Sequence, residues 1–268
     1  MADPFLRWAG SKRSHLAQLA RVVPATYAHY YEPFLGSGSL FFHLEPARAT
    51  LGDQLEALVR TYEGVRANPR AVFDRYSAWQ VNKDAYLEVR GLRPADVSEA
   101  AAQFIYLNKT AWNGLYRVNR SGQFNVPFGL PKSSNIVALD ALTAAAALLK
   151  RATINHGDFE QTLSTAEPND LVFVDPPYVT AHNDNGFVHY NETLFSWSDQ
   201  ERLARRCADL RENGVHVIVT NAAHASVRDL YAGFYVTEIT RHSTLAGNPA
   251  KRRSVKELIF STQRPREA

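Results

Sequence analysis

Short apolar runs that end in an acidic residue or a glycine-bearing turn are the most constraining feature of this 268-residue chain. The run "TYAHYYEP" at 26–33 enters the turn "FLGSGSLF", "RATLGD" at 48–53 ends in Asp53, and "LVFV" at 171–174 is followed directly by "DPPY". Apolar runs of this length, alternating with segments of helical apolar spacing, are typical of buried parallel strands. The pattern predicts an α/β fold with a doubly wound, Rossmann-like sheet.

Between residues 67 and 134 the sheet pattern is interrupted. The interruption contains three helical pieces, at 69–79, 83–90 and 98–109. A polar stretch with aromatic residues and glycines follows at 110–132, and then helices and strands resume, including a helix after 197 that we expect Ser198 or Asp199 to cap. We therefore expect one α/β domain, made of residues 1–66 and 135–268, with a mostly helical insertion at 67–134.

Composition excludes several classes of protein. The chain has no apolar run of the roughly 18 residues that a membrane span needs, and its N-terminus lacks the apolar middle of a signal peptide. Cys207 is the only cysteine, which excludes a disulfide framework and a cysteine metal cluster. Its helical surroundings, "RRCADL", favour a packing or surface role over a reactive one. We expect a cytoplasmic protein without a membrane partner.

The distribution of charge says more than the net charge of +3. Two segments combine basic residues with glycine and polar or aromatic residues and contain no acid: "NGLYRVNRSGQFNVPFGLPK" at 113–132 and "RHSTLAGNPAKRRSVK" at 241–256. Such segments are either solvated basic faces or contacts to DNA or RNA, and the charge pattern alone leaves both readings open.

The turn "EPFLGSGS" at 32–39 suits a cofactor site. In open α/β sheets, ligands bind at the carboxyl ends of the strands, and Gly36 and Gly38 allow the backbone to approach a ligand closely. Asp53 ends the next strand, where a carboxylate can accept hydrogen bonds from a ribose. Phe41 stands where the dinucleotide fingerprint needs a small residue, so an adenosine-containing cofactor other than NAD is favoured.

"DPPY" is the most specific motif. Pro176 and Pro177 fix the backbone, cannot continue a strand ladder and hold their carbonyls out as acceptors. An exocyclic amine donates two hydrogen bonds, which Asp175 and the Pro176 carbonyl can accept, while Tyr178 can stack on a flipped-out base. The motif indicates methyl transfer to an exocyclic amine, with an ordinary strand-ending proline turn as the alternative.

Several motifs in the same order resemble the Dam-type DNA adenine-N6 methyltransferases, the D12 class. The resemblance covers nearly the whole chain and rests on "FLRWAGSK" (5–12), "YEPFLGSGS" (31–39), "LGD" ending at Asp53, "LNKTAWNGLYRVNRSGQFNVPFG" (107–129), "GDF" (157–159), "DPPY" and "RRSVKELIF" (252–260). It implies S-adenosylmethionine as cofactor and double-stranded DNA as partner. It also implies that residues 67–134 are a target-recognition insertion with a β-hairpin, and that the remainder is the catalytic domain.

The resemblance implies cofactor-binding residues along the chain: Trp8, Ala9, Gly10, Lys12, Glu32, Pro33, Phe34, Gly36, Gly38, Asp53, Asp158, Phe159 and Asp175. In the family, Trp8 and Lys12 match residues beside the methionine part, Asp53 the ribose acceptor, and Asp158 with Phe159 the adenine pocket. The implied catalytic residues are Asp175, Pro176, Pro177 and Tyr178. No metal is expected, since His182, Asp184 and His189 fit no standard site.

The implied DNA-binding residues are Arg7, Trp112, Asn113, Leu115, Arg117, Asn119, Arg120, Asn125, Pro127, Lys251, Arg252 and Arg253. Trp112 matches the family's intercalating aromatic, with a core tryptophan as the alternative. Arg117 can bind guanine O6 and N7 bidentately. Together, Arg7, Leu115, Arg117 and Pro127 match the family's readers of GATC or of a site that contains it.

Three departures from the family pattern bear on specificity more than on activity. Ser11 replaces a glycine of the family's "WAGGK", Leu55 replaces an asparagine, and "TNAA" at 220–223 replaces "SNHD". The segment 179–197 is long for a loop, and its aromatic residues Phe187, Tyr190 and Phe195 are candidates for a lid over the extruded base.

Other functions stay as alternatives. A cytosine-N4 methyltransferase usually carries serine at the position of Asp175, and a protein-glutamine or RNA amine methyltransferase usually carries asparagine there. A catalytically silent DNA-binding module tends to lose Asp53 or "DPPY", and both are intact. We expect a monomer that is associated with the nucleoid, and a cognate restriction endonuclease is a candidate partner.

Overall fold

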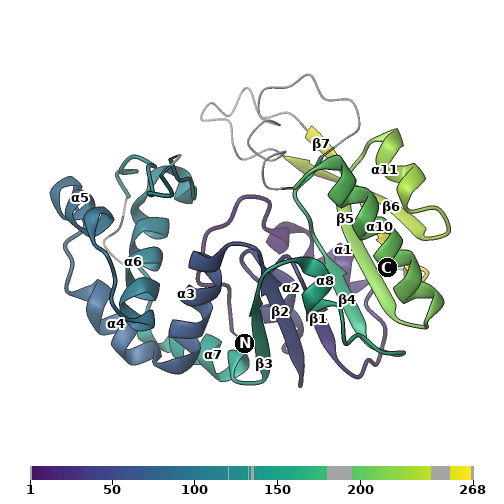
Figure 1. Ribbon diagram of the computed structural model, residues 1–268, viewed down its shortest axis with the longest axis horizontal. Coiled ribbons are helices and arrows are strands. Elements are labelled where there is room, and N and C mark those ends of the chain that lie inside the picture. Colours follow the sequence, from purple (N-terminus) through teal and green to yellow (C-terminus); the bar gives the residue numbers. More distant parts are fainter. Residues whose placement is uncertain are drawn as a thin grey trace. The chain divides into compact units, whose positions relative to one another are not determined.

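The computed structural model describes residues 2–119, 121–131, 133, 136–179, 195–242 and 254–266. Contacts divide the chain into two compact units. Unit 1 comprises Met1–Leu16 and Leu35–Gly157, and unit 2 comprises Ala17–Phe34 and Asp158–Ala268. Both units combine helices with β-strands, which confirms the predicted mixed α/β class (Figure 1).

Unit 1 contains η1 (Lys12–His15), α2 (Ser39–Leu44), β2 (Ala49–Asp53), α3 (Glu56–Ala67), α4 (Pro69–Ser77), α5 (Lys83–Gly91), α6 (Val97–Thr110), η2 (Trp112–Gly114), α7 (Leu139–Leu149) and β3 (Ala152–His156). Strands β2 and β3 pair in parallel, from Ala49 opposite Ala152 to Asp53 opposite His156. Helix α3 packs against both strands and against α6. The predicted insertion therefore lies within the single connection between two neighbouring parallel strands.

The helices α4, α5 and α6 of this connection (Figure 1, blue to teal) start at asparagine or aspartate caps. The side chains of Asn68, Asn82 and Asp96 accept hydrogen bonds from the backbone of the first turn of α4, α5 and α6, respectively. Pro69 at the first position of α4 has the φ angle a helix start needs and lacks only an N–H that would have no helical partner there. These local signals explain why sequence periodicity located these three helices well.

The predicted β-hairpin follows α6. Antiparallel bridges join Ala111 to Phe128 and Val118 to Phe124, and the N–H of Asn125 donates to the carbonyl of Arg117 at 3.0 Å. Backbone hydrogen bonds thus pair the two arms of the segment 111–129, and the hairpin is confirmed.

Unit 2 contains β1 (Tyr30–Glu32), α8 (Phe159–Thr162), β4 (Leu171–Val174), α10 (Trp197–Glu212), β5 (His216–Ala222), α11 (Ala225–Leu230), β6 (Tyr235–His242) and β7 (Ser254–Ser261), and α1 (Leu16–Ala20) begins at its boundary with unit 1. Its strands follow the order β1, β4, β5, β7, β6. The first three are parallel, whereas β7 runs antiparallel to both β5 and β6. This is a mixed sheet of the Rossmann-like methyltransferase kind, in which an antiparallel pair closes one edge.

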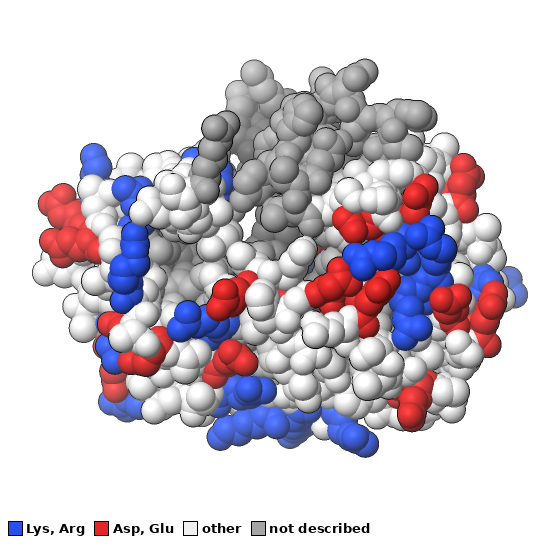
Figure 2. Space-filling model, in the orientation of Figure 1, with Lys and Arg blue, Asp and Glu red and all other residues white. Residues whose placement is uncertain are grey.

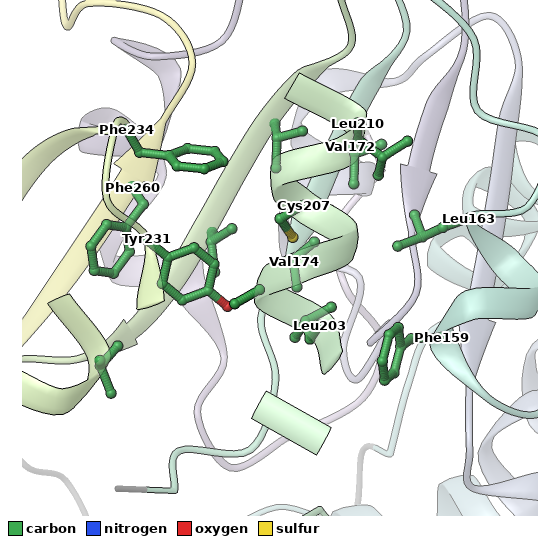
Figure 3. Close-up of a cluster of buried hydrophobic side chains, with 14 of the residues drawn as sticks. Phe159, Leu163, Val172, Val174, Leu203, Cys207, Leu210, Tyr231, Phe234 and Phe260 are labelled. Carbon is green, nitrogen blue, oxygen red and sulfur yellow. The ribbon is translucent and has the colours of Figure 1, made fainter. Parts of the chain in front are cut away.

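The core of unit 2 lies between this sheet and α10 (Figure 3). All four residues of β4 are buried, which explains why its sequence is continuously apolar. Cys207 on α10 is fully buried in this core, and burial raises the pKa of its thiol to about 12. Of the two roles expected for Cys207, in packing or on the surface, the structure shows packing.

Helix α10 starts at Trp197, before the residues that were expected to cap it, Ser198 and Asp199. Its N-cap is Ser196, whose hydroxyl accepts from the Asp199 N–H, while the Asp199 carboxylate accepts from the Ser196 N–H in a capping box. The predicted cap was wrong because Asp199 occupies the third helical position, where it takes the reciprocal role.

Charge on the face seen in Figure 2 is mixed, with lysines and arginines in separate groups and acidic side chains beside several of them. Among the described residues, no helix combines the length and hydropathy needed to cross a membrane.

Candidate active site

The glycine turn of unit 1 is held from three sides. Gly36 has a φ of +47°, and its N–H donates to Asp53 Oδ2 at 3.1 Å. Its carbonyl accepts from the buried Tyr62 hydroxyl at 2.8 Å. A Cβ on Gly36 would lie only 2.7 Å from Trp8 Cδ1. Glycine is therefore required for backbone conformation and for the close approach of Trp8.

Asp53 joins the glycine turn to the end of β2. Its Oδ1 accepts from the Leu55 N–H at 3.0 Å, so each carboxylate oxygen accepts from at least one backbone donor. Burial raises the pKa of Asp53, while the N–H groups of Leu55, Gly36 and Gln54 oppose that shift. A carboxylate offers about four lone-pair sites, so beside these three backbone donors Asp53 keeps capacity for another donor such as a hydroxyl.

The N-terminal segment of unit 1 lies beside the same turn. Lys12 is buried, and its ammonium donates to the Gly10 carbonyl at 2.7 Å. The Ser11 hydroxyl lies 2.8 Å from that of Ser39 and 3.1 Å from that of Ser37, at the start of α2. Ser11, which replaces the family's glycine, thus adds a third hydroxyl to those of Ser37 and Ser39.

Arg7 lies against the base of the hairpin. Its N–H donates to Asn108 Oδ1 at 2.8 Å, and its carbonyl accepts from Asn108 Nδ2 at 2.7 Å. A Cβ on Gly114 would lie 2.7 Å from both Cβ and Cδ of Arg7, so the Arg7 side chain packs directly against the Gly114 backbone. Sequence reasoning predicted Arg7 and the hairpin separately and gave Asn108 no role.

Trp112 and Arg117 differ in how far the hairpin restrains them. Trp112 is 48% exposed, so the alternative of a core tryptophan is wrong. The exposed Arg117 donates from Nε to Asn125 Oδ1 at 2.8 Å and from Nη2 to the Asn125 carbonyl at 3.3 Å. The guanidinium is thereby aligned along the hairpin.

The other predicted hairpin residues lie on the same segment. Asn113 has a φ of +54°, and the Asn119 side chain accepts from the backbone of Ser121 and Gln123, which shapes the tip. Leu115 is partly buried and Pro127 is exposed.

In unit 2, the predicted catalytic motif, residues 175–178, follows the end of β4. Asp175 Oδ1 accepts from the Thr220 hydroxyl of β5 at 2.6 Å. The Tyr178 hydroxyl lies 3.5 Å from the same oxygen and donates to Glu257 Oε2 of β7 at 3.1 Å. Burial, and then Asp175 and Glu257, raise the pKa of Tyr178 well above its usual value, so the phenol keeps its proton.

A buried amide pair supports the same turn. Gln200 of α10 donates to the Pro177 carbonyl at 3.0 Å, and its Oε1 accepts from Asn221 Nδ2 at 3.1 Å. Both amides are fully buried. Sequence reasoning gave no role to Thr220, Gln200, Asn221 or Glu257, although "TNAA" contains two of them and "RRSVKELIF" contains the glutamate.

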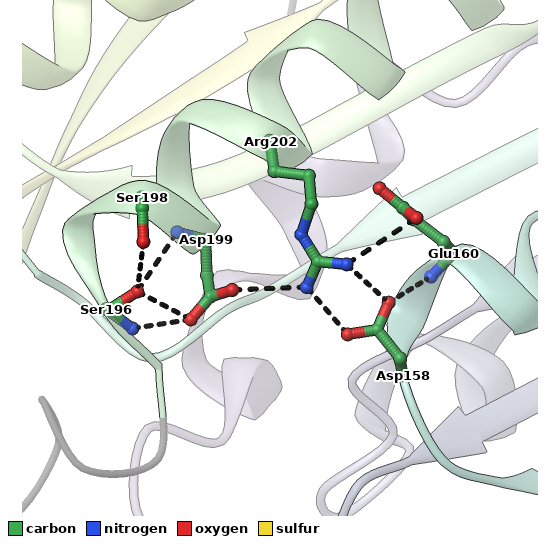
Figure 4. A network of polar contacts seen from close by, with 6 residues as sticks. All are labelled: Asp158, Glu160, Ser196, Ser198, Asp199 and Arg202. Carbon is green, nitrogen blue, oxygen red and sulfur yellow. Dashed lines mark hydrogen bonds and ion pairs between the residues drawn. The ribbon is translucent and has the colours of Figure 1, made fainter.

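The predicted adenine-pocket pair is part of a polar network (Figure 4). Asp158 accepts from Arg202 at 2.7 Å and 3.2 Å, and Arg202 also pairs with Asp199 and Glu160. The Arg202 guanidinium lies 4.5 Å from the centroid of the Phe159 ring.

The ring of Phe159 is only 4% exposed. Phe34 stacks on it at a centroid distance of 5.7 Å, and Phe34 is itself partly exposed. Glu32, the first residue of the predicted "EPF" stretch, is buried and accepts from the Tyr30 hydroxyl at 2.8 Å. Of the two stacked rings, Phe34 has more surface for another planar group.

Several predicted residues lie outside the described residues: Arg120, His182, Asp184, Phe187, Tyr190, His189, Lys251, Arg252 and Arg253. Phe195 of the predicted lid is described, and its ring packs edge-on against Phe34 at 5.5 Å. Within the described ranges, no group of His, Cys, Asp and Glu side chains has the arrangement of a metal site.

The fold and the motif at the end of β4 define an enzyme of the Rossmann-like methyltransferase class. A model of the D12 class N6 adenine-specific DNA methyltransferases matches residues 8–245. The chain belongs to this family, and it is an adenine-specific DNA methyltransferase.

Three curated relatives match almost end to end. The chain is 32% identical to the type II methyltransferase M1.LlaDCHI of Lactococcus lactis subsp. cremoris, with 96% of this chain and 94% of the relative covered. It is 31% identical to the type II methyltransferase M.MjaIII of Methanocaldococcus jannaschii, with 96% and 98% covered. It is 30% identical to a DNA adenine methylase of Vibrio cholerae, with 95% and 94% covered.

Proposed function

We propose that this enzyme transfers the methyl group of S-adenosylmethionine to N6 of an adenine flipped out of duplex DNA, at GATC or at a site that contains it. The observation that carries the proposal is the arrangement of Asp175 in unit 2. Its carboxylate follows β4, one oxygen is fixed by Thr220, and the fixed prolines come directly after it.

The Asp175 carboxylate and the Pro176 carbonyl are the proposed acceptors for the two N–H groups of the target amine. A fixed pair of acceptors orients the nitrogen lone pair toward the incoming methyl group and lowers the entropy cost of alignment. Tyr178 is the proposed stacking surface for the extruded base, and Gln200 holds the Pro177 carbonyl so that this turn keeps its shape. No covalent enzyme intermediate is needed for this reaction.

S-adenosylmethionine supplies an electrophilic methyl group on a sulfonium. In unit 1, Asp53 retains acceptor capacity for a ribose hydroxyl, and Gly36 and Gly38 keep side chains out of the turn. Lys12 is the proposed partner of the methionine carboxylate, beside Trp8, Ala9 and Gly10. In unit 2, Glu32, Pro33, Phe34, Asp158 and Phe159 are the proposed residues on the purine side, with Phe34 as the partly exposed ring.

For DNA, we propose that the hairpin of unit 1 enters the duplex, with the exposed Trp112 intercalating. Arg7, Leu115, Arg117 and Pro127 are the proposed readers of the outer base pairs. In this role residues 67–134 act as the recognition insertion, and residues 1–66 and 135–268 as the catalytic domain. We also propose that the enzyme is a monomer of the cytoplasm, associated with the nucleoid, and that it acts alone or beside a cognate restriction endonuclease.

The test is methyl transfer from labelled S-adenosylmethionine to duplexes that differ only in GATC, followed by nucleoside mass spectrometry. N6-methyladenine confined to GATC duplexes is the expected product. N6-methyladenine in other duplexes would overturn the proposed target. N4-methylcytosine would overturn the assignment of adenine as the target base. Absence of transfer from S-adenosylmethionine would overturn the proposed cofactor. Raised fluorescence of 2-aminopurine at the target position on enzyme binding tests base flipping separately.

A further inference from the structure

A buried acidic side chain lies behind the catalytic motif of unit 2. Glu257 is 1% exposed and sits on β7, directly opposite Ala222 of β5. Burying a carboxylate is costly unless polar groups around it compensate, and the Tyr178 hydroxyl is one such group, 3.1 Å from Oε2. A carboxylate at this position is therefore coupled directly to the motif that carries the chemistry.

The Tyr178 hydroxyl has one proton to donate and lies near two carboxylates, those of Glu257 and Asp175. The distance to Glu257 Oε2 is 3.1 Å, whereas that to Asp175 Oδ1 is 3.5 Å, beyond the usual range for an O–H donor. Asp175 Oδ1 already accepts from Thr220 at 2.6 Å, a length typical of a hydroxyl bound to a charged oxygen. The geometry directs the phenol proton to Glu257 and the threonine proton to Asp175.

We propose that Glu257 is a positioning residue for methyl transfer: it accepts the Tyr178 hydroxyl, fixes the orientation of the tyrosine ring and keeps that hydroxyl from donating to Asp175. The inference rests on the proposed role of Asp175 as acceptor for the target amine. A second hydroxyl donating to Asp175 would compete with the amine for the carboxylate charge and weaken its pull on the N–H.

A positioning role for Glu257 differs from a purely structural one in its dependence on the Tyr178 hydroxyl. A purely structural glutamate would affect stability through its own burial, independently of the Tyr178 hydroxyl. A residue that acts through Tyr178 loses its effect on methyl transfer once the hydroxyl is removed.

The kinetic experiment is a double-mutant cycle of Glu257→Gln and Tyr178→Phe, read as single-turnover methyl transfer to a duplex substrate. Glu257→Gln alone is expected to slow transfer about tenfold, the size of one charged hydrogen bond. In the Tyr178→Phe background, the same substitution is expected to change the rate by less than about twofold. An equal slowing in both backgrounds would overturn the proposal.

The second experiment needs no methyl transfer, so it separates this inference from the proposed function. The protein is labelled with tyrosine enriched in ¹³C at Cζ, and the Tyr178 resonance is assigned by its loss in Tyr178→Phe. The resonance is expected to shift in Glu257→Gln and to stay in place in Glu238→Gln, a control on the neighbouring strand whose carboxylate pairs with Lys256 and Arg228.

An unmoved Tyr178 resonance in Glu257→Gln would overturn the inference whatever the enzyme methylates. If Glu257→Gln does not fold, Glu257→Asp is used instead, because it moves the carboxylate away from Tyr178 by one methylene. The Tyr178 resonance is then expected to shift in Glu257→Asp, and an unmoved resonance would overturn the inference. A shifted resonance in an enzyme that transfers no methyl group would instead refute the proposed function and leave the contact established.

Discussion

Asn108 holds both backbone polar groups of Arg7. Its Oδ1 accepts from the Arg7 N–H at 2.8 Å, and its Nδ2 donates to the Arg7 carbonyl at 2.7 Å. The same nitrogen lies 3.3 Å from the carbonyl of Gly114, and Asn108 is only 2% exposed. One buried amide therefore ties the segment around Arg7 to the base of the hairpin at 111–129.

Asn108→Ala should destabilise unit 1 and weaken DNA binding. The substitution leaves the partly buried backbone groups of Arg7 and the buried carbonyl of Gly114 without this partner, which costs about 1–3 kcal/mol of unfolding free energy. Urea unfolding measures that loss, and fluorescence anisotropy with a GATC duplex measures binding. The control is Asn213→Ala, at an exposed helix end in unit 2. A loss no larger than that of the control would contradict this role.

Arg117→Ala should relax sequence specificity rather than abolish activity. A bidentate arginine–guanine pair discriminates by about 1–3 kcal/mol, which corresponds to roughly 5- to 150-fold in the ratio of kcat/KM for GATC over a duplex with one outer base pair changed. Arg70→Ala, whose guanidinium pairs with Asp74 on α4, is the control. Equal losses on all duplexes would indicate a phosphate contact instead.

Gly36→Ala should displace Trp8 and strain the backbone. A non-glycine residue at a φ of +47° costs about 1 kcal/mol or more, and its Cβ would meet Trp8 at 2.7 Å. Loss of stability and weaker S-adenosylmethionine binding by calorimetry are the expected results. Gly91→Ala is the matched control, because a Cβ there meets nothing within 4 Å. Equal behaviour of the two variants would refute the close approach.

Lys109→Met should alter how stability depends on pH. Burial, and then the charges of Arg7 and Arg13, lower the pKa of Lys109 to about 8. In the unfolded chain a lysine keeps its proton up to about pH 10.4, so between these values the unfolded state binds more protons and stability rises with pH. Replacing the partly buried charge with methionine should raise the unfolding free energy. This gain should shrink as the pH rises from about 7.5 to about 9.5, because Lys109 of the folded wild type loses its charge over that range. With the exposed Lys83→Met as control, a constant gain would contradict the shift.

The parallel strands and the helices of the insertion were predictable because their signals are local. Buried strands such as Leu171–Val174 are continuously apolar, and Asn68, Asn82 and Asp96 mark helix starts within a few residues. The motif "DPPY" was likewise visible because its chemistry needs adjacent residues.

The supporting polar contacts were not predictable, because their partners are far apart in sequence. Asn108 lies 101 positions from Arg7, and Glu257 lies 79 positions from Tyr178. Neither residue type signals such a role by itself, since a lone asparagine or glutamate usually lies on the surface. Arg202 beside Asp158 belongs to the same class, because the fold alone brings α10 to the start of α8.

Single-turnover methyl transfer with Asp175→Ala measures whether Asp175 is the acceptor for the target amine. We expect the rate to fall about 10²–10³-fold or more, with circular dichroism and the unfolding midpoint close to those of the wild type. Turnover near the wild-type rate in a folded Asp175→Ala enzyme would contradict this role.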